Sequence, residues 1–420
     1  MMQVSTKFIL FCLYVLLDSC KSIPIVSTEE PALLIVSFDG LRPDYLHRNV
    51  TPNLNLIGKE GVSAQFMRPV FPTKTFVNHF SIATGLYPGN HGVLANAVYD
   101  TEMGLLKYSY DLFHYNESTI PIWTANEMAG KTSGCWWPGS DYEYNGVSCM
   151  FTRSFNGSVP FEERVDTVIK WVTHEKTPAN LVMMYFEEPD QTSHPYGPDS
   201  IQVTNAVASV DRVTQYIEET LMANNLQNRV NVIFLSDHGM VGVPISNIID
   251  LTLFLATDIC KMYGTSPVLQ IVPNDPSDES EIFTNLTRAA EQNGHFNVYN
   301  QYDLPARWNA NNARRMGPIL AVAEVGYAFQ DLLIDFKIYE KNLNVPITNQ
   351  SIYGVHGYDN EEPLMNAFFM AKGPIFGKDE QIETIDMIDL YNLFCLILKI
   401  ECYSNDGSNN SSIWNALFVP

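Results

Sequence analysis

Three apolar runs, each followed closely by acidic residues, constrain the fold of this chain more than any other feature. They are ALLIVSF (32–38) before Asp39, NLVMMYF (180–186) before Glu187 to Asp190, and VNVIFL (230–235) before Ser236 and Asp237. Each run has the length and the β-forming residues of a strand that is buried on both faces. Stretches of helical pattern separate the runs, and the clearest extends from Asp199 to Asn225. The pattern predicts an α/β fold in which helices cover both faces of a largely parallel central sheet.

The carboxyl ends of the predicted strands are where ligands bind in sheets of this kind, and each of these ends carries an acid. Together with three histidines, the acids form a set of six candidate metal ligands: Asp39, Asp190, His194, Asp237, His238 and His356. Carboxylates and imidazoles are suitable ligands for zinc, and six of them are enough for two ions. A single aspartate at such a position is more often a turn residue or a helix N-cap. Three strands that end in the same way instead predict a metal site.

A hydroxyl that could act as a nucleophile lies in the segment PTKTF, at Thr75. The following residues, FVNHFSIAT, are predicted to form a helix whose N-terminal amides would point toward an anion. In isolation, Thr75 is read more simply as a helix N-cap. Beside six candidate metal ligands a nucleophile is the better interpretation, because metal coordination favours the alkoxide.

The first 22 residues have the pattern of a signal peptide. Lys7 precedes an apolar stretch from Phe8 to Leu17, and small and polar residues continue to Ser22. The stretch is short for a membrane span, so we expect cleavage and a secreted protein without a stable membrane anchor, an uncleaved anchor being the alternative. Seven N-x-S/T sequons suit a secreted protein with N-glycans: Asn49, Asn116, Asn156, Asn285, Asn349, Asn409 and Asn410. The C-terminal residues 403–420 are predicted to be a flexible tail.

The net charge of −22 at pH 7 disfavours long nucleic acids and anionic membranes as partners. It leaves small phosphate compounds possible, because bound metal ions would dominate the local charge. Two of the seven cysteines lie in the predicted signal peptide. The other five are close enough in sequence for the pairs Cys135 with Cys149 and Cys395 with Cys402, which leaves Cys260.

Six segments of the chain together resemble the nucleotide pyrophosphatase/phosphodiesterase family of ectoenzymes, within the alkaline phosphatase superfamily. They follow in the family's order: PTKTFVNHFSIATGLYPGNHGVLANAVYD (72–100), WPGSD (137–141), NGSVPFEER (156–164), EEPDQTSHPYGP (187–198), SDHGM (236–240) and HGYDN (356–360). The resemblance extends from about Pro31 to Cys402. It implies an alkaline-phosphatase-like fold and one phosphodiesterase catalytic domain over residues 31–402.

The resemblance also implies how the candidate residues divide the work. Asp190, His194 and His356 would bind one zinc ion, and Asp39, Asp237 and His238 would bind the other together with Thr75. Two zinc ions about 4 Å apart stabilise the attacking and the leaving oxygens of an in-line displacement. Thr75 would form a phosphothreonine-type ester that water then hydrolyses, while Asn96 would donate to a non-bridging phosphate oxygen.

By the same resemblance, Phe76, Phe155 and Tyr185 would surround a nucleotide base, and Asp141 would lie near its edge. Aromatic walls suit a planar heterocycle because the two stack. We therefore expect a two-zinc phosphodiesterase/pyrophosphatase that hydrolyses nucleotides or dinucleotides and releases a nucleoside 5′-monophosphate. Two alternatives stay open. One is a choline-phosphoester or lysophospholipid phosphodiesterase, and the other is a catalytically silent secreted binding glycoprotein.

Some positions depart from the family pattern. Ser193 stands where the family has a glycine, and a positive φ there would strain the backbone that holds His194. Pro195 disfavours helical conformation at His194, so an irregular turn is predicted for this ligand pair. His79 and His91 lie outside the ligand pattern and are predicted to be structural.

Overall fold

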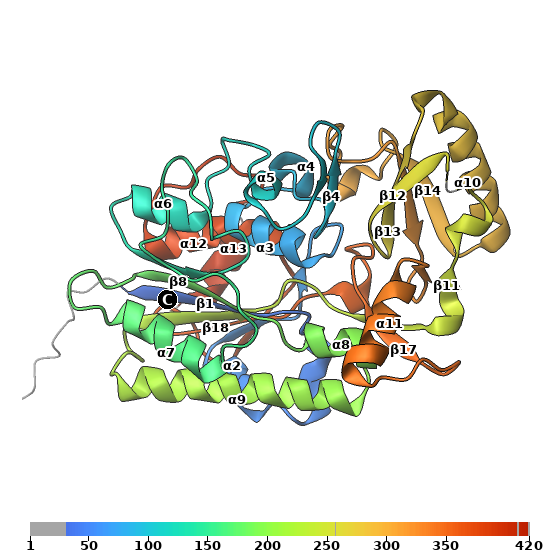
Figure 1. The fold of residues 1–420 in the computed structure, drawn as a ribbon. Coiled ribbons are helices and arrows are strands. Elements are labelled where there is room, and N and C mark those ends of the chain that lie inside the picture. The colour runs from blue at the N-terminus through green and yellow to red at the C-terminus, as the bar shows by residue number, and fades with distance from the viewer. Residues whose placement is uncertain (1–30, 257, 410, 419–420) are drawn as a thin grey trace, which may run out of the picture. The chain divides into compact units, whose positions relative to one another are not determined.

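An eight-stranded sheet forms the centre of the fold in the computed structural model, which describes residues 31–256, 258–409 and 411–418 (Figure 1). The strand order is β19 (Glu380–Ile382), β2 (Val62–Ala64), β18 (Phe369–Lys372), β9 (Val230–Leu235), β1 (Ala32–Phe38), β8 (Leu181–Phe186), β6 (Ser133–Trp136) and β7 (Phe151–Thr152). Only β18 runs antiparallel to its neighbours, so the predicted largely parallel sheet is confirmed. The predicted signal peptide, residues 1–22, lies outside the described residues.

The three apolar runs of the sequence form adjacent strands, because β1 pairs with β8 on one side and with β9 on the other. Every residue of β1 is buried. Leu33 and Ile35 point into one hydrophobic cluster, whereas Leu34 and Val36 point into a second cluster on the opposite face. Since successive side chains of a strand alternate between faces, both faces of the sheet need a covering layer.

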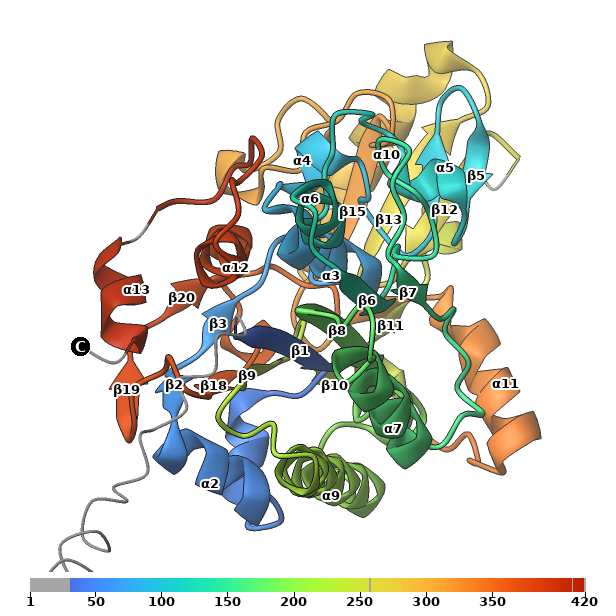
Figure 2. The ribbon, with the colours of Figure 1, turned by 90° about the vertical axis from the view of Figure 1, so that its left-hand side faces the viewer.

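Helices provide this layer on both faces, as Figure 2 shows. One face is covered by α2 (Pro52–Glu60), α7 (Phe161–Val172) and α9 (Ile201–Ala223), and the other by α3 (Thr75–Thr84), α6 (Ile122–Met128) and α12 (Leu390–Leu398). Helix α9 is the one predicted over 199–225, and Ser200 caps it by accepting a hydrogen bond from the Val203 amide. Ile201 is 66% exposed, because it lies two residues before the buried Val203 and so on the opposite side of the helix.

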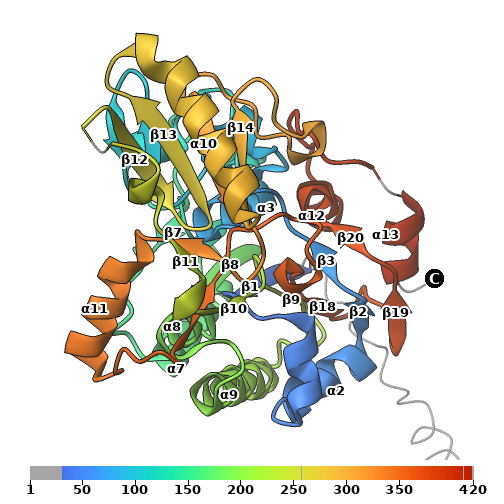
Figure 3. The same ribbon diagram turned by 90° about the vertical axis from the view of Figure 1, so that its right-hand side faces the viewer.

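A second, smaller sheet is antiparallel and has its own hydrophobic cluster, with α10 (Glu279–Asn293) packed along it (Figure 3). Its strand order is β12 (Cys260–Thr265), β13 (Val268–Pro273), β15 (Ile319–Ala323) and β14 (Phe296–Asn300). The sequence patterns above did not predict this sheet. Helix α11 (Leu332–Leu343) follows, and β17 (Ile352–Val355) then pairs with β10 (Val241–Pro244), which brings His356 beside the segment after β9.

Short elements connect these parts. They are β3 (Met67–Arg68), α4 (Pro88–His91), β4 (Val98–Asp100), β5 (Gly104–Leu106), α5 (Tyr110–Phe113), α8 (Asp190–Tyr196), β11 (Ile248–Ile249), β16 (Ala328–Phe329), β20 (Ile385–Asp386) and α13 (Ser411–Leu417). Among the residues that the structure describes, no helix is long and apolar enough to cross a membrane.

The described part of the 403–420 segment contacts the predicted catalytic domain at several residues, although most of its residues are exposed. Trp414 and Leu417 are buried. Upstream of them, the Asp406 amide donates to the Gly85 carbonyl at 2.8 Å, and the Ser408 amide donates to Asp389 at 2.6 Å. The polar composition of the segment suggested a loop. Composition alone does not show that distant residues accept hydrogen bonds from its amides.

The cysteines follow the sequence prediction in part. Cys135 and Cys149 form a disulfide. Cys395 and Cys402 are unbonded, although their side chains are hydrogen-bonded neighbours, and Cys260 is a buried free thiol. Only one of the two bridges is therefore present in the structure.

Candidate metal and nucleophile site

The acids that follow β1, β8 and β9 lie together at one edge of the sheet, as predicted from the strand pattern. The Asp190 amide donates to the Asp39 carbonyl at 3.1 Å, and the Gly40 amide donates to Oδ1 of Asp237 at 3.1 Å. All three aspartates are buried. The hydrogen bonds between neighbouring strand ends thus hold three carboxylates in one place.

Asp190 and His194 lie on α8, so the predicted irregular turn is wrong. The helix contains Pro195 near its C-terminal end, where the missing N–H removes a single hydrogen bond. The amides of Ser193 and Gly197 still close the turns onto Pro189 and Ser193 at 2.9 Å each. Ser193 has no positive φ, and its hydroxyl donates to the Pro189 carbonyl at 2.7 Å. The serine at this position therefore does not strain the backbone that holds His194.

Each candidate histidine ligand has one ring nitrogen that is hydrogen-bonded to a backbone carbonyl. Nδ1 of His194 donates to the Gly354 carbonyl, Nδ1 of His238 to the Gly239 carbonyl and Nδ1 of His356 to the Thr73 carbonyl, each at 2.9 Å. A carbonyl can only accept, so the proton resides on Nδ1 and Nε2 keeps its lone pair. This arrangement of outer partners is typical of histidines that bind a metal ion through Nε2.

The free Nε2 atoms face the carboxylates. Nε2 of His238 lies 3.4 Å from Oδ1 of Asp39 and 3.0 Å from Oδ2 of Asp237. Nε2 of His356 lies 3.6 Å from Oδ1 of Asp190, and Nε2 of His194 lies 3.1 Å from Oδ2 of the same aspartate. The sequence-derived set of six ligands is therefore assembled in space.

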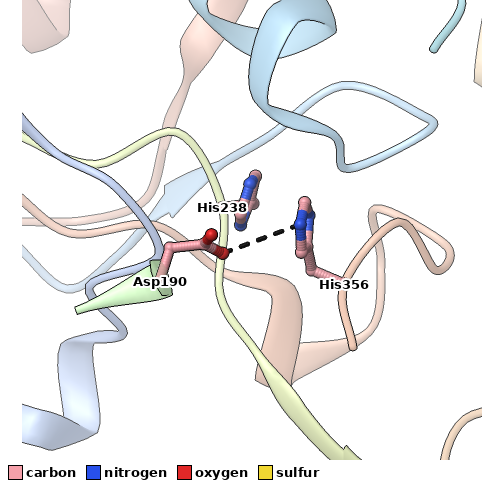
Figure 4. Close-up of side chains that lie close together, drawn as sticks. All are labelled: Asp190, His238 and His356. Atoms are coloured by element: carbon pink, nitrogen blue, oxygen red, sulfur yellow. Dashed lines mark ion pairs between the residues drawn. The ribbon is translucent and has the colours of Figure 1, made fainter. Parts of the chain in front are cut away.

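Two buried triads within this set could each hold a metal ion, and they share a histidine. One triad is Asp39, Asp237 and His238, and the other is Asp190, His238 and His356 (Figure 4). The rings of His238 and His356 stack with their centroids 3.7 Å apart. His194 contacts Asp190 but lies outside the second triad, where His238 takes the place expected for it. His238 thus faces both candidate ion positions.

The electrostatics of the site fit cations. Oδ1 of Asp39, Oδ1 of Asp190 and Oδ2 of Asp237 are buried without a hydrogen-bond donor. Burial, followed by repulsion from Asp237 and Asp190, raises the pKa of Asp39 well above its usual range. A buried carboxylate without a counter-charge costs several kcal/mol. Two metal ions would supply that charge, so the donor set fits a binuclear centre.

Thr75 is the first residue of α3, and its Oγ1 lies 3.4 Å from Nε2 of His238. The N-cap of this helix is Lys74, so Thr75 is not a capping residue. Asn96 accepts a hydrogen bond from the Phe76 amide through Oδ1 at 3.0 Å. This bond orients the side chain and leaves the Asn96 NH₂ group as a donor beside Thr75.

A cavity of about 770 Å³ opens beside the triads. It is lined by Asp39, Thr75, Phe76, Asn96, Tyr108, Trp136, Trp137, Pro138, Asp141, Tyr142, Ser154, Phe155, Tyr185, Asp190, His194 and His356. The cavity walls therefore include every residue that the sequence assigned to the substrate. Phe76 packs edge-on against Tyr108 with ring centroids 5.1 Å apart, and Phe155 packs against Tyr185 at 5.6 Å.

Sequence reasoning did not identify Tyr108 and Lys74 in this region, and it predicted only a structural role for His79. Tyr108 lines the cavity and donates its hydroxyl hydrogen to Oδ2 of Asp141, whose Oδ1 is buried without a donor. His79 donates from Nδ1 to the Thr75 carbonyl at 2.8 Å, with Oδ2 of Asp237 at 3.3 Å. The i, i+4 spacing of Thr75 and His79 on one helix was the available signal for this contact.

Lys74 was also not identified. Burial lowers the pKa of Lys74 to about 8, and its ammonium donates to the Ser266 carbonyl. It lines a second cavity, of about 210 Å³, together with His194, Asp335 and Tyr339. Only the tertiary structure shows that this lysine lines a cavity together with the candidate ligands His194 and His356.

Comparisons with known proteins agree with this geometry. A family model described as type I phosphodiesterase/nucleotide pyrophosphatase matches residues 33–359. The chain is 34% identical to the Xenopus laevis protein bis(5′-adenosyl)-triphosphatase enpp4, covering 95% of this chain and 84% of that one. It is also 34% identical to ectonucleotide pyrophosphatase/phosphodiesterase family member 5 of Homo sapiens, covering 98% and 83%.

A solved structure has the same fold. It is murine ectonucleotide pyrophosphatase/phosphodiesterase 5, as an inactive threonine-to-alanine variant in complex with AMP. The TM-score is 0.83 at 32% sequence identity, and the match covers 93% of this chain and 100% of that one. This chain therefore belongs to the type I phosphodiesterase/nucleotide pyrophosphatase family, within the alkaline phosphatase superfamily, and is a hydrolase.

Proposed function

We propose that this protein is a secreted two-zinc phosphodiesterase/pyrophosphatase. It hydrolyses phosphodiester or phosphoanhydride bonds of nucleotides or dinucleotides and releases a nucleoside 5′-monophosphate. The observation that carries the proposal is a single cavity whose walls combine Thr75 and four of the six candidate metal ligands with the aromatic residues Phe76, Phe155 and Tyr185. A phosphodiester can then have its phosphorus at the ligands while its planar base lies between aromatic rings.

In this proposal the six ligands hold two zinc ions. Asp190, His194 and His356 bind one ion, and Asp39, Asp237 and His238 bind the other together with Thr75. His238 also faces the first ion position, because it lies in one triad with Asp190 and His356. When bound, the ions supply positive charge that stabilises the attacking and leaving oxygens of an in-line displacement. Nitrogen and carboxylate ligands without thiolates suit zinc in a catalytic centre.

The chain's own residues position the reaction. Thr75 Oγ1 attacks phosphorus, and the first alcohol or phosphate leaves as the threonine ester forms. The Asn96 NH₂ group donates to a non-bridging oxygen, while its Oδ1 accepts from the Phe76 amide in the first turn of α3. His79 holds the Thr75 carbonyl in place. Water then hydrolyses the ester and releases the nucleoside 5′-monophosphate.

The aromatic cavity supports a nucleotide rather than a lipid headgroup. Oδ1 of Asp141 is buried without a donor, so it can accept an N–H group from a base edge. Among the relatives, the Xenopus laevis protein is named a bis(5′-adenosyl)-triphosphatase, and the murine structure contains AMP. Both ligands present an adenine ring.

The residues of the second cavity favour a leaving phosphate that is esterified to a second nucleoside. The Lys74 ammonium donates a hydrogen bond to the Ser266 carbonyl, and Asp335 places a carboxylate in the wall of the same cavity. A free terminal phosphate carries more negative charge than a phosphate esterified to a second nucleoside. We therefore propose dinucleoside polyphosphates as better substrates than nucleoside triphosphates.

The surrounding chain fits an extracellular enzyme in this proposal. Residues 1–22 are the signal peptide, and residues 31–402 are the catalytic domain. The Cys135–Cys149 disulfide is expected in an oxidising compartment. Mass spectrometry of protein collected from the culture medium tests this part: it should lack residues 1–22 and carry N-glycans. Full-length protein retained in cells would contradict it.

A substrate panel tests the activity. Purified protein with its bound metal counted should hydrolyse diadenosine triphosphate far faster than glycerophosphocholine, and the product should contain AMP. A preference for glycerophosphocholine would favour the choline-phosphoester alternative. Protein that holds two zinc ions but hydrolyses neither compound, nor a chromogenic nucleotide ester, would favour the silent binding glycoprotein.

A further inference from the structure

Arg164 joins the two segments that form one aromatic wall of the cavity. It lies in the first turn of α7 and is 1% exposed. Two of its N–H groups donate to carbonyls of the loop after β7, at Asn156 (3.4 Å) and Val159 (3.1 Å). The other three donate at the end of β8, to the Tyr185 carbonyl (3.4 Å) and to both carboxylate oxygens of Glu187 (2.6 and 2.9 Å). A guanidinium has five N–H donors, so all of them are used.

The loop that Arg164 holds carries Phe155. This side chain is 53% exposed, yet it lines the cavity and packs against the Tyr185 ring. The Arg164 guanidinium carbon lies 5.6 Å from the centre of the Phe155 ring. The backbone of the loop makes its own turn, from the Val159 amide to the Asn156 carbonyl at 3.1 Å. That turn does not reach β8, and Arg164 supplies the connection.

The ion pair of Arg164 and Glu187 is buried, and its formation costs hydration free energy of both groups. Glu187 is also buried, at 8% exposure. A buried ion pair usually stabilises a fold no better than apolar residues of similar volume, because both charges lose their hydration. The planar fork of arginine, in contrast, holds several acceptors in fixed directions. The contacts of Arg164 are therefore better explained by the placement of Phe155 than by stability.

We propose that Arg164 and Glu187 are positioning residues for substrate specificity: they fix Phe155 opposite Tyr185 and so set the slot that receives the nucleotide base. This inference rests on the proposed nucleotide phosphodiesterase function and adds residues that do not themselves touch the substrate. The two residues act on the nucleoside side of the scissile bond and leave the leaving-group side alone.

The test uses two substrates with the same leaving group. One is the p-nitrophenyl ester of adenosine 5′-monophosphate, and the other is methyl p-nitrophenyl phosphate, which has no base. Arg164→Lys keeps a positive charge beside Glu187 but cannot reach all five acceptors, so it avoids an unpaired buried carboxylate. In Arg164→Lys and in Glu187→Gln, the ratio of kcat/KM for the nucleoside ester to that for the methyl ester should fall about tenfold, mainly through KM, as on weakening one aromatic contact to a base.

Two further measurements separate positioning from a general structural role. In a Phe155→Ala background, Arg164→Lys should cause little additional loss in this ratio, because its effect passes through Phe155. Hydrogen exchange of residues 153–160 should become faster in Arg164→Lys. Arg288→Lys is the matched control, because Arg288 is exposed on α10 and should leave both readouts unchanged.

The outcomes are distinct. Equal losses on both esters, a full additional loss in the Phe155→Ala background, or unchanged exchange of residues 153–160 would each overturn the inference. If the native enzyme shows no preference for the nucleoside ester, the proposed nucleotide function fails and the specificity role fails with it. If Phe155→Ala lowers the ratio and Arg164→Lys does not, only the positioning role fails.

Discussion

The hydroxyl of Tyr185 donates a hydrogen bond of 2.6 Å to Oδ2 of Asp39, while its ring packs against Phe155 in the cavity. One side chain therefore contacts both a candidate metal ligand and a wall of the proposed base pocket. The hydrogen bond orients Asp39 so that Oδ1, which has no donor, points toward His238. The sequence indicated only the second of these two roles.

Tyr185→Phe should weaken metal binding while keeping the ring. Loss of an outer partner of a metal ligand typically lowers metal affinity by about 10- to 100-fold. Zinc retention measured against a chelator of known affinity gives this value. Tyr142→Phe, which removes a hydroxyl elsewhere on the cavity wall, is the matched control. Equal zinc retention in Tyr185→Phe and native protein would show that the hydrogen bond does not support the site.

Thr75→Ala should abolish turnover, by roughly 10³-fold or more, because no other group takes the place of a missing nucleophile. Its metal content should stay close to that of the native protein, since the aspartate and histidine ligands are all retained. Steady-state kinetics with a nucleotide ester and metal analysis of the same sample provide both numbers. Thr84→Ser, at the far end of the same helix, is the control. Turnover that persists in Thr75→Ala would remove Thr75 from its proposed role.

His238→Ala should reduce the zinc content more than Asp190→Ala or His356→Ala. His238 faces both triads, whereas each of the other two residues belongs to one. We expect the Asp190 and His356 variants to lose about one ion per chain and the His238 variant to lose more than one. Elemental analysis after exhaustive dialysis distinguishes these cases. Equal losses in all three variants would contradict a shared histidine.

His91 should make the fold sensitive to acid. Nδ1 of His91 accepts from the Val93 amide at 3.1 Å, and its Nε2 lies 2.9 Å from the Ser81 hydroxyl. Burial, followed by the charge of Arg315, lowers the pKa of His91 to about 3. The folded protein therefore holds this ring neutral, while the unfolded chain protonates it near its ordinary pKa of about 6.5.

Proton linkage determines the direction in which the free energy of unfolding changes with pH. Above about pH 6.5 the ring is neutral in both states, and His91 does not lower the free energy of unfolding. As the pH falls from 6.5 toward 3, the unfolded chain binds a proton that the folded protein does not, so the free energy of unfolding decreases. At pH 5 the loss from this residue alone is about 2 kcal/mol. Urea unfolding at pH 7.5 and pH 5 should show a smaller decrease in the free energy of unfolding for His91→Gln than for the native protein. The same decrease in both proteins would rule out His91 as the source.

Asp335→Asn should improve the use of free triphosphates. Asp335 lines the second cavity, where its carboxylate would repel a terminal phosphate. We expect kcat/KM for ATP to rise about three- to tenfold relative to that for diadenosine triphosphate, which corresponds to one partly screened charge contact. Glu340→Gln, an exposed acid on the same helix, is the control. An unchanged ratio would show that the terminal phosphate does not approach Asp335.

The strands of the site and the acids at their ends were predictable because the signal is local. A run of apolar residues followed by an acid occupies consecutive positions in the sequence. Strands β1, β8 and β9 lie almost where this pattern predicts them. The same holds for the helix that begins at Thr75. The division of the six ligands between two ions needed the family resemblance, because no local pattern links His356 to Asp190.

The tertiary structure alone decided which contacts support these residues. Nδ1 of His356 donates to the carbonyl of Thr73, which is 283 positions away in the chain. Such contacts depend on how distant segments pack, and residue order does not record that packing. The same reason explains why the sharing of His238, the hydrogen bond from Tyr185 to Asp39 and the five contacts of Arg164 became visible only in the folded chain.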